Sequence, residues 1–201
     1  MFDIEKAINA QILISRKIIK KKLEKEPKTI CGMDVSYKND FGYGVAVILS
    51  YPDLKLIDVV ITKKKPPIPY IPTFLGFREM PFLFELIKKA KSDLYIINGH
   101  GICHPRKCGI ATHFGVCFNV PTIGIAKKLI KGFKVINDNV LFNNEIIAKK
   151  YKNFYISIGN LITLEDAYNI IKNCTKYSLP EPLRLAHNIS KNIAKRDNEN
   201  E

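Results

Sequence analysis

Residues 94–101 read Leu94-Tyr95-Ile96-Ile97-Asn98-Gly99-His100-Gly101 and join an apolar run to an abrupt polar end. Four apolar residues in a row predict a short strand that is buried on both faces. The two glycines after Asn98 allow a tight turn and the close approach of a ligand. A polar side chain at the carboxyl end of a buried strand is where α/β proteins usually place their chemistry. A strand-to-loop turn without function is the alternative.

The composition indicates a globular protein with a polyanionic partner. The chain has 201 residues, a hydrophobic content of 46% and a net charge of +13. This length fits one domain, 1–201, and a monomer is the default expectation. The charge favours nucleic acid as the partner over an anionic membrane surface. The sequence shows no apolar run long enough for a membrane span and no secretory signal. Its odd count of 5 cysteines suggests reduced thiols in the cytoplasm.

The first half of the chain predicts a helix followed by an antiparallel meander. A helical stripe of isoleucines covers residues 3–25 and ends before Pro27. Turn formers then separate three strands, at Thr29–Tyr37, Tyr43–Ser50 and Leu56–Thr62. A second helix opens at residues 77–81, with Pro81 in its first turn, and runs to about Ala90.

The second half predicts strands that alternate with helices. After the central strand come a helix at 109–118 and a strand at Pro121–Ile125. Residues 130–160 form a peripheral β segment, with largely apolar runs at Phe133–Ile136, Val140–Phe142 and Phe154–Ile158. Thr163 caps another helix, and the last helix begins near Pro182, with residues 190–201 as a frayed polar tail. This order predicts a ribonuclease H-like α/β fold: a mixed five-strand sheet, antiparallel meander then parallel strands, with helices on both faces.

Three polar residues fall where they could bind a metal. Asp34 lies within an apolar strand, Glu79 near a helix start and Asn98 at the end of the central strand. Oxygen ligands at one sheet edge of a basic protein suggest Mg²⁺ or Mn²⁺, which would assist displacement at phosphorus. The alternatives are a water-facing aspartate on an edge strand and a helix-start carboxylate without further role.

Other side chains near the central strand suggest supporting roles or a rival site. Lys127 could neutralise charge on a phosphate, and His104 could transfer a proton or hold a phosphate or base. A structural zinc is the rival interpretation, because six candidate ligands fall within eighteen residues, although none has the tight spacing of a Cys-x-x-Cys pair. They are His100, Cys103, His104, Cys108, His113 and Cys117.

Residues 66–72 hold four prolines and form a stiff, extended loop after three lysines. Tyr70 and Ile71, held between Pro69 and Pro72, make a rigid apolar wedge beside positive charge. Such wedges enter base steps, and aromatic rings stack on exposed bases. A proline-rich linker or partner motif is the alternative.

Seven motifs, in order along nearly the whole chain, resemble the endonuclease V family. They are Met33–Val35, Pro69–Pro72, Phe77–Glu79, Gly99–Arg106, Ala111–Gly115, Pro121–Lys128, and Leu179–Pro182 with Arg184, Ala186 and His187. The resemblance implies a Mg²⁺-dependent endonuclease, in which Mn²⁺ can substitute, acting on DNA or RNA that contains inosine, with uracil as a second lesion. Such enzymes cut the second phosphodiester bond 3′ to the lesion and leave a 3′-hydroxyl and a 5′-phosphate.

The resemblance also implies a role for individual residues. Asp34 would be a metal ligand, Glu79 would complete the carboxylate set, and Tyr70 would be the tip of a wedge that separates strands. Lys127 and His113 would be auxiliary catalytic or phosphate-binding groups. Leu75, Gly99 and His104 would line the pocket for a base that has left the stack.

Asn98 departs from the family pattern, which has Asp before Gly-His-Gly. An amide oxygen can ligate a metal but carries no negative charge, so we expect weaker Mg²⁺ binding and slower cleavage. The chain is then either a natural enzyme of reduced activity or one substituted to trap a substrate complex. Because Asn has nearly the same shape as Asp, we favour the deliberate substitution. A protein that binds inosine-containing nucleic acid without cleaving it is the alternative function.

Overall fold

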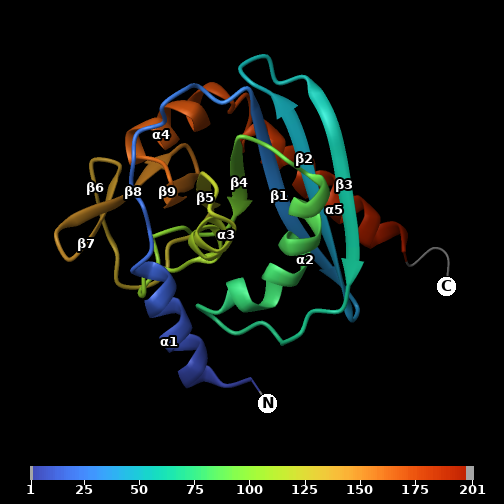
Figure 1. Cartoon of the computed structure of the whole chain (residues 1–201), viewed down its shortest axis with the longest axis horizontal. Coiled ribbons are helices and arrows are strands. Elements are labelled where there is room, and N and C mark those ends of the chain that lie inside the picture. Colours follow the sequence, from blue (N-terminus) through green and yellow to red (C-terminus); the bar gives the residue numbers. More distant parts are fainter. Residues whose placement is uncertain (1, 198–201) are drawn as a thin grey trace.

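The computed structural model describes residues 2–197, in which nine strands form one mixed sheet (Figure 1). The strand order is β3-β2-β1-β4-β5-β9-β8-β7-β6. The predicted meander is confirmed, with β1 (Thr29–Lys38), β2 (Phe41–Ser50) and β3 (Leu56–Lys64) antiparallel. The predicted parallel strands are confirmed as well, because β4 (Leu94–Asn98) lies parallel to β1 and to β5 (Thr122–Ala126).

The sheet is wider than the five strands that the sequence predicts. β9 (Phe154–Asn160) pairs antiparallel with β5, and β8 (Glu145–Tyr151), β7 (Asn139–Phe142) and β6 (Lys134–Ile136) follow outward. The segment predicted as peripheral therefore continues the main sheet, and β8 had not been predicted. The physical reason lies in β9, where Phe154, Ile156 and Ile158 are buried and complete the apolar face beside β5.

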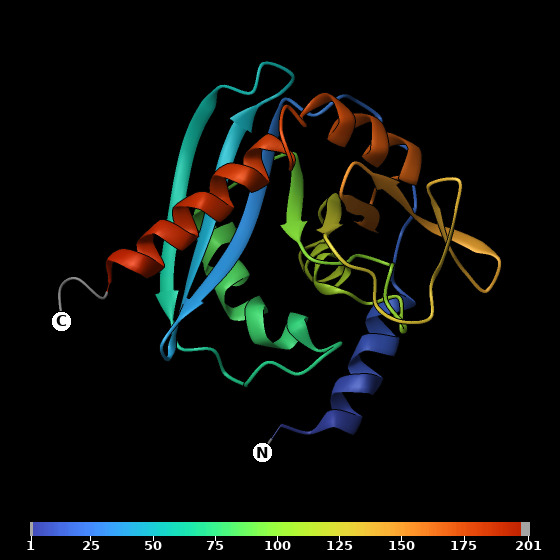
Figure 2. The ribbon, with the colours of Figure 1, turned by 180° about the vertical axis from the view of Figure 1, so that it is seen from behind.

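Helices cover both faces of the sheet, as predicted. α2 (Leu75–Lys89) and α3 (Ile110–Phe118) lie on one face, and α4 (Leu164–Asn173) and α5 (Glu181–Arg196) on the other (Figures 1 and 2). Successive β1 side chains alternate between the two apolar clusters, with Ile30 toward α5 and Cys31 toward α2. No helix within residues 2–197 is long and apolar enough to cross a membrane.

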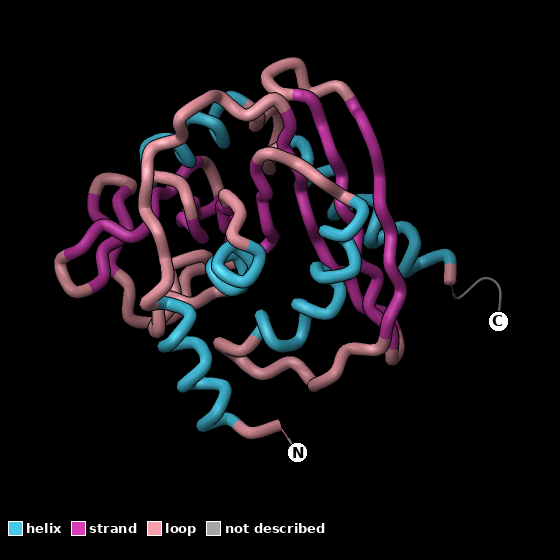
Figure 3. Tube along the Cα trace, viewed as in Figure 1, coloured by secondary structure: helices cyan, strands magenta, loops and turns pink. Residues whose placement is uncertain are grey.

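The first helix, α1 (Ile4–Ser15), ends ten residues before the predicted boundary at residue 25. Figure 3 shows the following segment as loop. Its backbone hydrogen-bonds to distant partners in place of helical ones, since Ile19 accepts from the Leu161 amide at 2.7 Å and donates to Asn160 Oδ1 at 2.9 Å. These tertiary contacts override the helical pattern of the isoleucines.

The second helix starts earlier than predicted, which changes the setting of Glu79. α2 begins at Leu75, so Pro81 is internal and Glu79 lies one turn inside the helix. The prediction of a first-turn proline was wrong. Glu79 faces the protein and is 7% exposed. Its position therefore contradicts the alternative in which it is only a solvated helix-start carboxylate.

The last helix lies directly across β1, as Figure 2 shows. Gly32 permits this close approach, because a Cβ there would lie 2.2 Å from the carbonyl carbon of Pro182. The helix continues to Arg196 with Ser190 and Ala194 buried, so the frayed tail expected from residue 190 is wrong as far as residue 197. The remaining part of that prediction, 198–201, lies outside the described residues.

Candidate active site

Strand register places Asp34 and Asn98 side by side. Met33 pairs with Ile97 across the parallel β1–β4 ladder, so the next residue of each strand points to the face that α5 covers. Asn98 Nδ2 donates to Asp34 Oδ1 at 2.5 Å. The sequence prediction that these two residues lie together is thus matched by their geometry.

α5 supplies two further partners to Asp34. Its Oδ2 accepts from His187 Nδ1 at 2.9 Å and from Ser190 Oγ at 3.0 Å. Burial raises the pKa of Asp34, but the hydrogen bonds from His187, Asn98 and Ser190 together bring it below its usual value. Sequence reasoning assigned no role to His187 or Ser190. Their one-turn spacing on a helix and the presence of His187 in the last motif were the available signals.

Glu79 approaches this pair from α2 on the opposite face of the sheet. The Tyr37 hydroxyl donates to Glu79 Oε1 at 3.3 Å. Burial, followed by the negative charge of Asp34, raises the pKa of Glu79 to about 8. Two buried carboxyl groups are therefore close enough for the charge of Asp34 to act on Glu79. We call Asp34, Glu79 and Asn98 the carboxylate centre.

The donor chemistry of the carboxylate centre fits a hard divalent cation. Within residues 2–197 no three His, Cys, Asp or Glu side chains converge as a metal site. The centre has two carboxylates and, in Asn98, an amide whose oxygen remains available because its nitrogen contacts Asp34. Two carboxylates, of which Asp34 disfavours the ionisation of Glu79, with a neutral oxygen beside them, suit Mg²⁺ or Mn²⁺ with one charge fewer than a three-acid set.

The cysteines and histidines considered for zinc have other surroundings. Cys103 and Cys108 are buried, and burial raises the pKa of each thiol to about 12. Cys117 is exposed on α3. Among the described residues these groups do not gather in threes, so the geometry gives the zinc interpretation no support.

Lys127 and His113 differ in how they relate to the carboxylate centre. Lys127 is exposed and follows Ile125, the register partner of Asn98, by two residues. His113 is buried between α2 and α3, with its ring 5.1 Å from that of Phe77. Burial lowers the pKa of His113 to about 4. Within residues 2–197 no hydrogen bond joins His113 to Asp34, Glu79 or Asn98.

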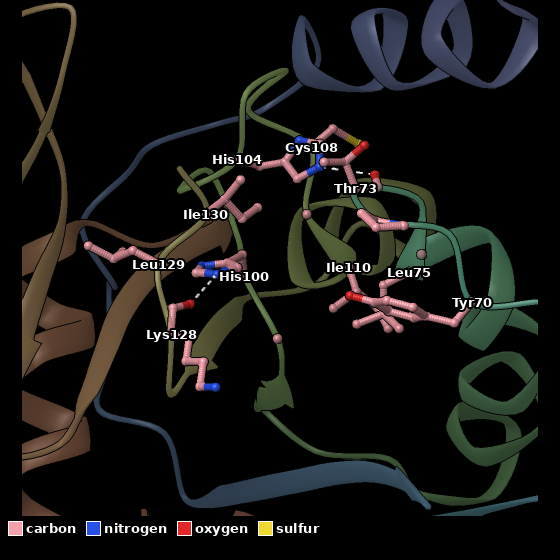
Figure 4. A pocket seen from close by; sticks show the side chains of 14 residues that line it. Tyr70, Thr73, Leu75, His100, His104, Cys108, Ile110, Lys128, Leu129 and Ile130 are labelled. Atoms are coloured by element: carbon pink, nitrogen blue, oxygen red, sulfur yellow. Dashed lines mark hydrogen bonds between the residues drawn. The ribbon is translucent and has the colours of Figure 1, made fainter. Parts of the chain in front are cut away.

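A cavity of about 270 Å³ has in its wall Gly99, the residue directly after Asn98, and Figure 4 shows the side chains that line it. Leu75, Gly99 and His104, the residues that the resemblance assigns to a base pocket, all line it. Tyr70 and Pro72 of the wedge also line it, and the Tyr70 ring is 66% exposed. Other parts of the wall come from the start of α3, with Ile110, and from the loop after β5, with Lys128, Leu129 and Ile130.

Gly99 joins the cavity to the carboxylate centre. It follows Asn98 directly, has φ +144°, and a Cβ there would lie 2.5 Å from Ile110 Cγ2. Both its backbone angle and its close packing require glycine. A group that contacts Gly99 in the cavity therefore lies next to the residue that follows Asn98 in the chain.

His104 is held by the backbone on both sides of its ring. Nδ1 accepts from the Arg106 amide at 3.2 Å, so Nε2 carries the proton and donates to the Thr73 carbonyl at 3.0 Å. Burial lowers the pKa of His104 to about 4. Because both ring nitrogens are engaged, the geometry favours cavity lining over the proton transfer considered from the sequence.

Comparisons with known proteins agree with this arrangement. The family model for endonuclease V matches residues 12–188. Endonuclease V of Thermosipho melanesiensis is 42% identical over 97% of this chain and 93% of its own length, and that of Pyrococcus abyssi is 37% identical over 94% and 91%.

Solved structures give the same result. An Asp→Asn variant of Ciona intestinalis endonuclease V, in complex with a 23mer DNA containing an inosine, is 30% identical with a TM-score of 0.86 and covers 98% of this chain and 99% of that chain. Bacillus subtilis endonuclease V shares the fold with a TM-score of 0.91 at 23% identity over 100% and 96%. By family model, sequence identity and coverage, this chain belongs to the endonuclease V family.

Proposed function

We propose that this chain is a Mg²⁺-dependent endonuclease that hydrolyses the second phosphodiester bond 3′ to a deaminated base, above all hypoxanthine, and leaves a 3′-hydroxyl and a 5′-phosphate. The observation that carries the proposal is the junction at Asn98–Gly99. On one side lie the two buried carboxylates, and on the other the cavity opens. A base that has left the stack and entered the cavity would bring the backbone of its own strand to Asp34 and Glu79.

Asp34, Glu79 and the amide oxygen of Asn98 would hold the Mg²⁺ or Mn²⁺. When bound, the ion supplies positive charge that activates water and stabilises the phosphate in the displacement. The protein's own contribution is orientation. His187 and Ser190 fix one oxygen of Asp34, and Asn98 fixes the other. Tyr37 holds Glu79, and Lys127 offers an exposed positive charge beyond β5.

The wedge, Pro69–Pro72, would separate the strands beside the lesion. Its tyrosine is exposed at the rim of the cavity, and Lys63, Lys64 and Lys65 precede it. The net charge of +13 supports attraction to a polyanionic strand. The inosine-containing DNA bound by the Ciona relative supports the same class of substrate.

We further propose that Asn98 lowers the activity of this chain. Replacing a carboxylate by an amide removes one negative charge from a divalent-ion site. We expect Asn98→Asp to raise kcat/KM by about 100-fold, which corresponds to about 2.7 kcal/mol of transition-state stabilisation.

Cleavage of end-labelled strands that carry one inosine, as DNA and as RNA, tests both proposals. The chain and Asn98→Asp are compared with Mg²⁺ and with Mn²⁺, and a strand with adenine in place of inosine is the control. Strong cutting by the Asn98→Asp variant alone supports the nuclease and the role of Asn98. Equal and strong cutting by both shows that two carboxylates suffice. Binding of inosine without cleavage by either supports the alternative, a protein that only recognises the lesion.

A further inference from the structure

Gln11 is a buried polar residue that the proposed chemistry does not use. It lies on α1, is 1% exposed, and its side chain hydrogen-bonds with residues far away in the sequence. Its Nε2 donates to the Thr73 carbonyl at 2.8 Å and to the Cys108 carbonyl at 3.3 Å. Its Oε1 accepts from Arg106 Nε at 2.5 Å. One amide thus uses two donors and one acceptor across three segments.

Thr73, the residue that Gln11 holds, directly follows the wedge. Its φ of +70° is a left-handed conformation that a β-branched residue rarely adopts without support. Its carbonyl accepts from Gln11, from His104 at 3.0 Å and from Arg106 Nη2 at 3.4 Å, and its hydroxyl accepts from the same Nη2 at 2.7 Å. Figure 4 shows Thr73 and His104 joined beside the cavity.

The other end of the wedge is held by a second arginine. Arg78 Nη1 donates to the carbonyl of Ile68, the residue directly before Pro69. The Arg78 guanidinium also lies 4.2 Å from the ring centroid of Tyr37, which donates to Glu79. Both ends of the exposed wedge are therefore fixed by hydrogen bonds from part-buried guanidinium groups. At the Thr73 end Gln11 also takes part, and Gln11 lies outside the seven motifs that resemble the family.

We infer that Gln11 is a positioning residue for strand separation. Through Thr73 and Arg106 it holds the carboxyl end of the wedge at a fixed place relative to the cavity. This inference rests on the proposed function, because it takes the wedge to open paired nucleic acid. A rigid wedge pre-organises the site for a duplex, whereas a single strand has nothing to separate. Loss of Gln11 should therefore weaken duplex recognition more than single-strand recognition.

The test compares Gln11→Leu with the parent chain on an inosine-containing single strand and on its duplex. Affinity is measured on both substrates, and fluorescence of 2-aminopurine placed next to the inosine reports unstacking in the duplex. Neither measurement requires cleavage. We expect an affinity for the single strand within about twofold of the parent, and a loss on the duplex of about tenfold with a smaller fluorescence rise, since hydrogen bonds that involve a charged group are removed.

Two controls and a second variant define the comparison. Asn9→Leu places the same change at an exposed position of α1 and should leave both substrates unaffected. Tyr70→Ala removes the wedge tip and should weaken duplex binding more than single-strand binding, where some loss is also expected because Tyr70 lines the cavity. Gln11→Glu keeps the acceptor for Arg106 but loses both donors, so it provides the test if Gln11→Leu unfolds below the assay temperature.

The outcomes separate this inference from the proposed function. Equal losses on both substrates, or an unchanged duplex signal, contradict the positioning role of Gln11. If the parent chain binds inosine and adenine strands equally, the proposed function itself fails, and the inference fails with it. Inosine preference together with a duplex-specific loss in the Gln11 variants supports both.

Discussion

The carboxylate centre and the cavity beside it use their hydrogen bonds in different ways. In the centre, side chains bond to side chains, so that Asn98, His187 and Ser190 all contact Asp34. In the cavity, His100 and His104 instead direct ring nitrogens to the backbone carbonyls of Lys128 and Thr73. In the centre, the amide oxygen of Asn98 stays available for a ligand because its nitrogen contacts Asp34. In the cavity, polar atoms fix the loops, and residues such as Leu75 and Ile110 supply apolar walls.

This difference shows which structural elements suit a metal-binding centre and which suit a ligand-binding cavity. The centre draws on strand register and two helices, which are rigid elements suited to charge that must stay in place. The cavity draws on loops, which must be fastened by specific hydrogen bonds before they can select a ligand. Changes in the centre should therefore affect catalysis more than binding, and changes in the cavity the reverse.

The largest effect is expected from Glu79→Gln in the Asn98→Asp background. The amide keeps the shape but removes a carboxylate from the metal set, so kcat/KM for an inosine strand should fall about 1000-fold. Affinity for the same strand should change less than about twofold. Glu85→Gln is the matched control, since Glu85 lies on the same helix and pairs with Lys64 and Lys88 at the surface. Cleavage retained in Glu79→Gln would remove Glu79 from the centre.

A smaller effect, on recognition, is expected from Gly99→Ala. The added methyl group would clash with Ile110, and a φ of +144° is unfavourable for alanine. The variant should therefore have a narrower cavity and a free energy of unfolding lower by about 1–3 kcal/mol. Preference for inosine over adenine strands, measured by competition binding, should fall about tenfold. Gly132→Ala separates the two causes, because Gly132 also has a positive φ, +101°, but no atom within 4 Å of its added Cβ. An equal loss of preference in both variants would contradict the steric argument.

The last effect concerns stability alone and is a pH dependence that comes from the cavity. The pKa of folded His104 is about 4, and the unfolded value is near 6.5. Between these values the unfolded chain binds more protons, so stability falls as pH falls from about 6.5 to about 4, by up to about 1.4 kcal/mol per pH unit. Urea unfolding at several pH values measures this slope.

His104→Gln should remove that part of the slope, because its amide can still donate to Thr73 but cannot protonate. His113, whose pKa is also lowered to about 4, accounts for a residual slope in the same range. An unchanged slope in the His104→Gln, His113→Gln double variant would show that neither histidine is buried in its neutral form.

Local patterns allowed the central fold to be predicted. The apolar run Leu94–Ile97 and the turn-separated strands at residues 29–62 have the expected strand order and orientation. The same patterns misjudged residues 16–25, where Ile19 hydrogen-bonds to Asn160 and Leu161 in place of helical partners. They also missed β8, in which Lys149 and Lys150 interrupt the apolar residues that pair across to β7 and β9.

The site was predicted only in part, for a related reason. Asp34, Glu79 and Asn98 stand out as polar residues next to apolar runs, and the structure brings them together. His187, Ser190 and Gln11 act through contacts more than sixty residues away in the sequence, which no local pattern encodes. The resemblance groups His113 with the catalytic residues, and in the structure its ring packs against Phe77.

The packing of α5 on Gly32 has a consequence for the synthesis of this protein. Asp34 leaves the ribosome early, but its partners on α5 follow 153 and 156 residues later. A nascent or truncated chain that stops before residue 187 can form the meander but cannot complete the hydrogen bonds around Asp34. The finished centre is thus completed only when α5 has been made, so an incomplete translation product would carry most of the chain's positive charge without a complete centre.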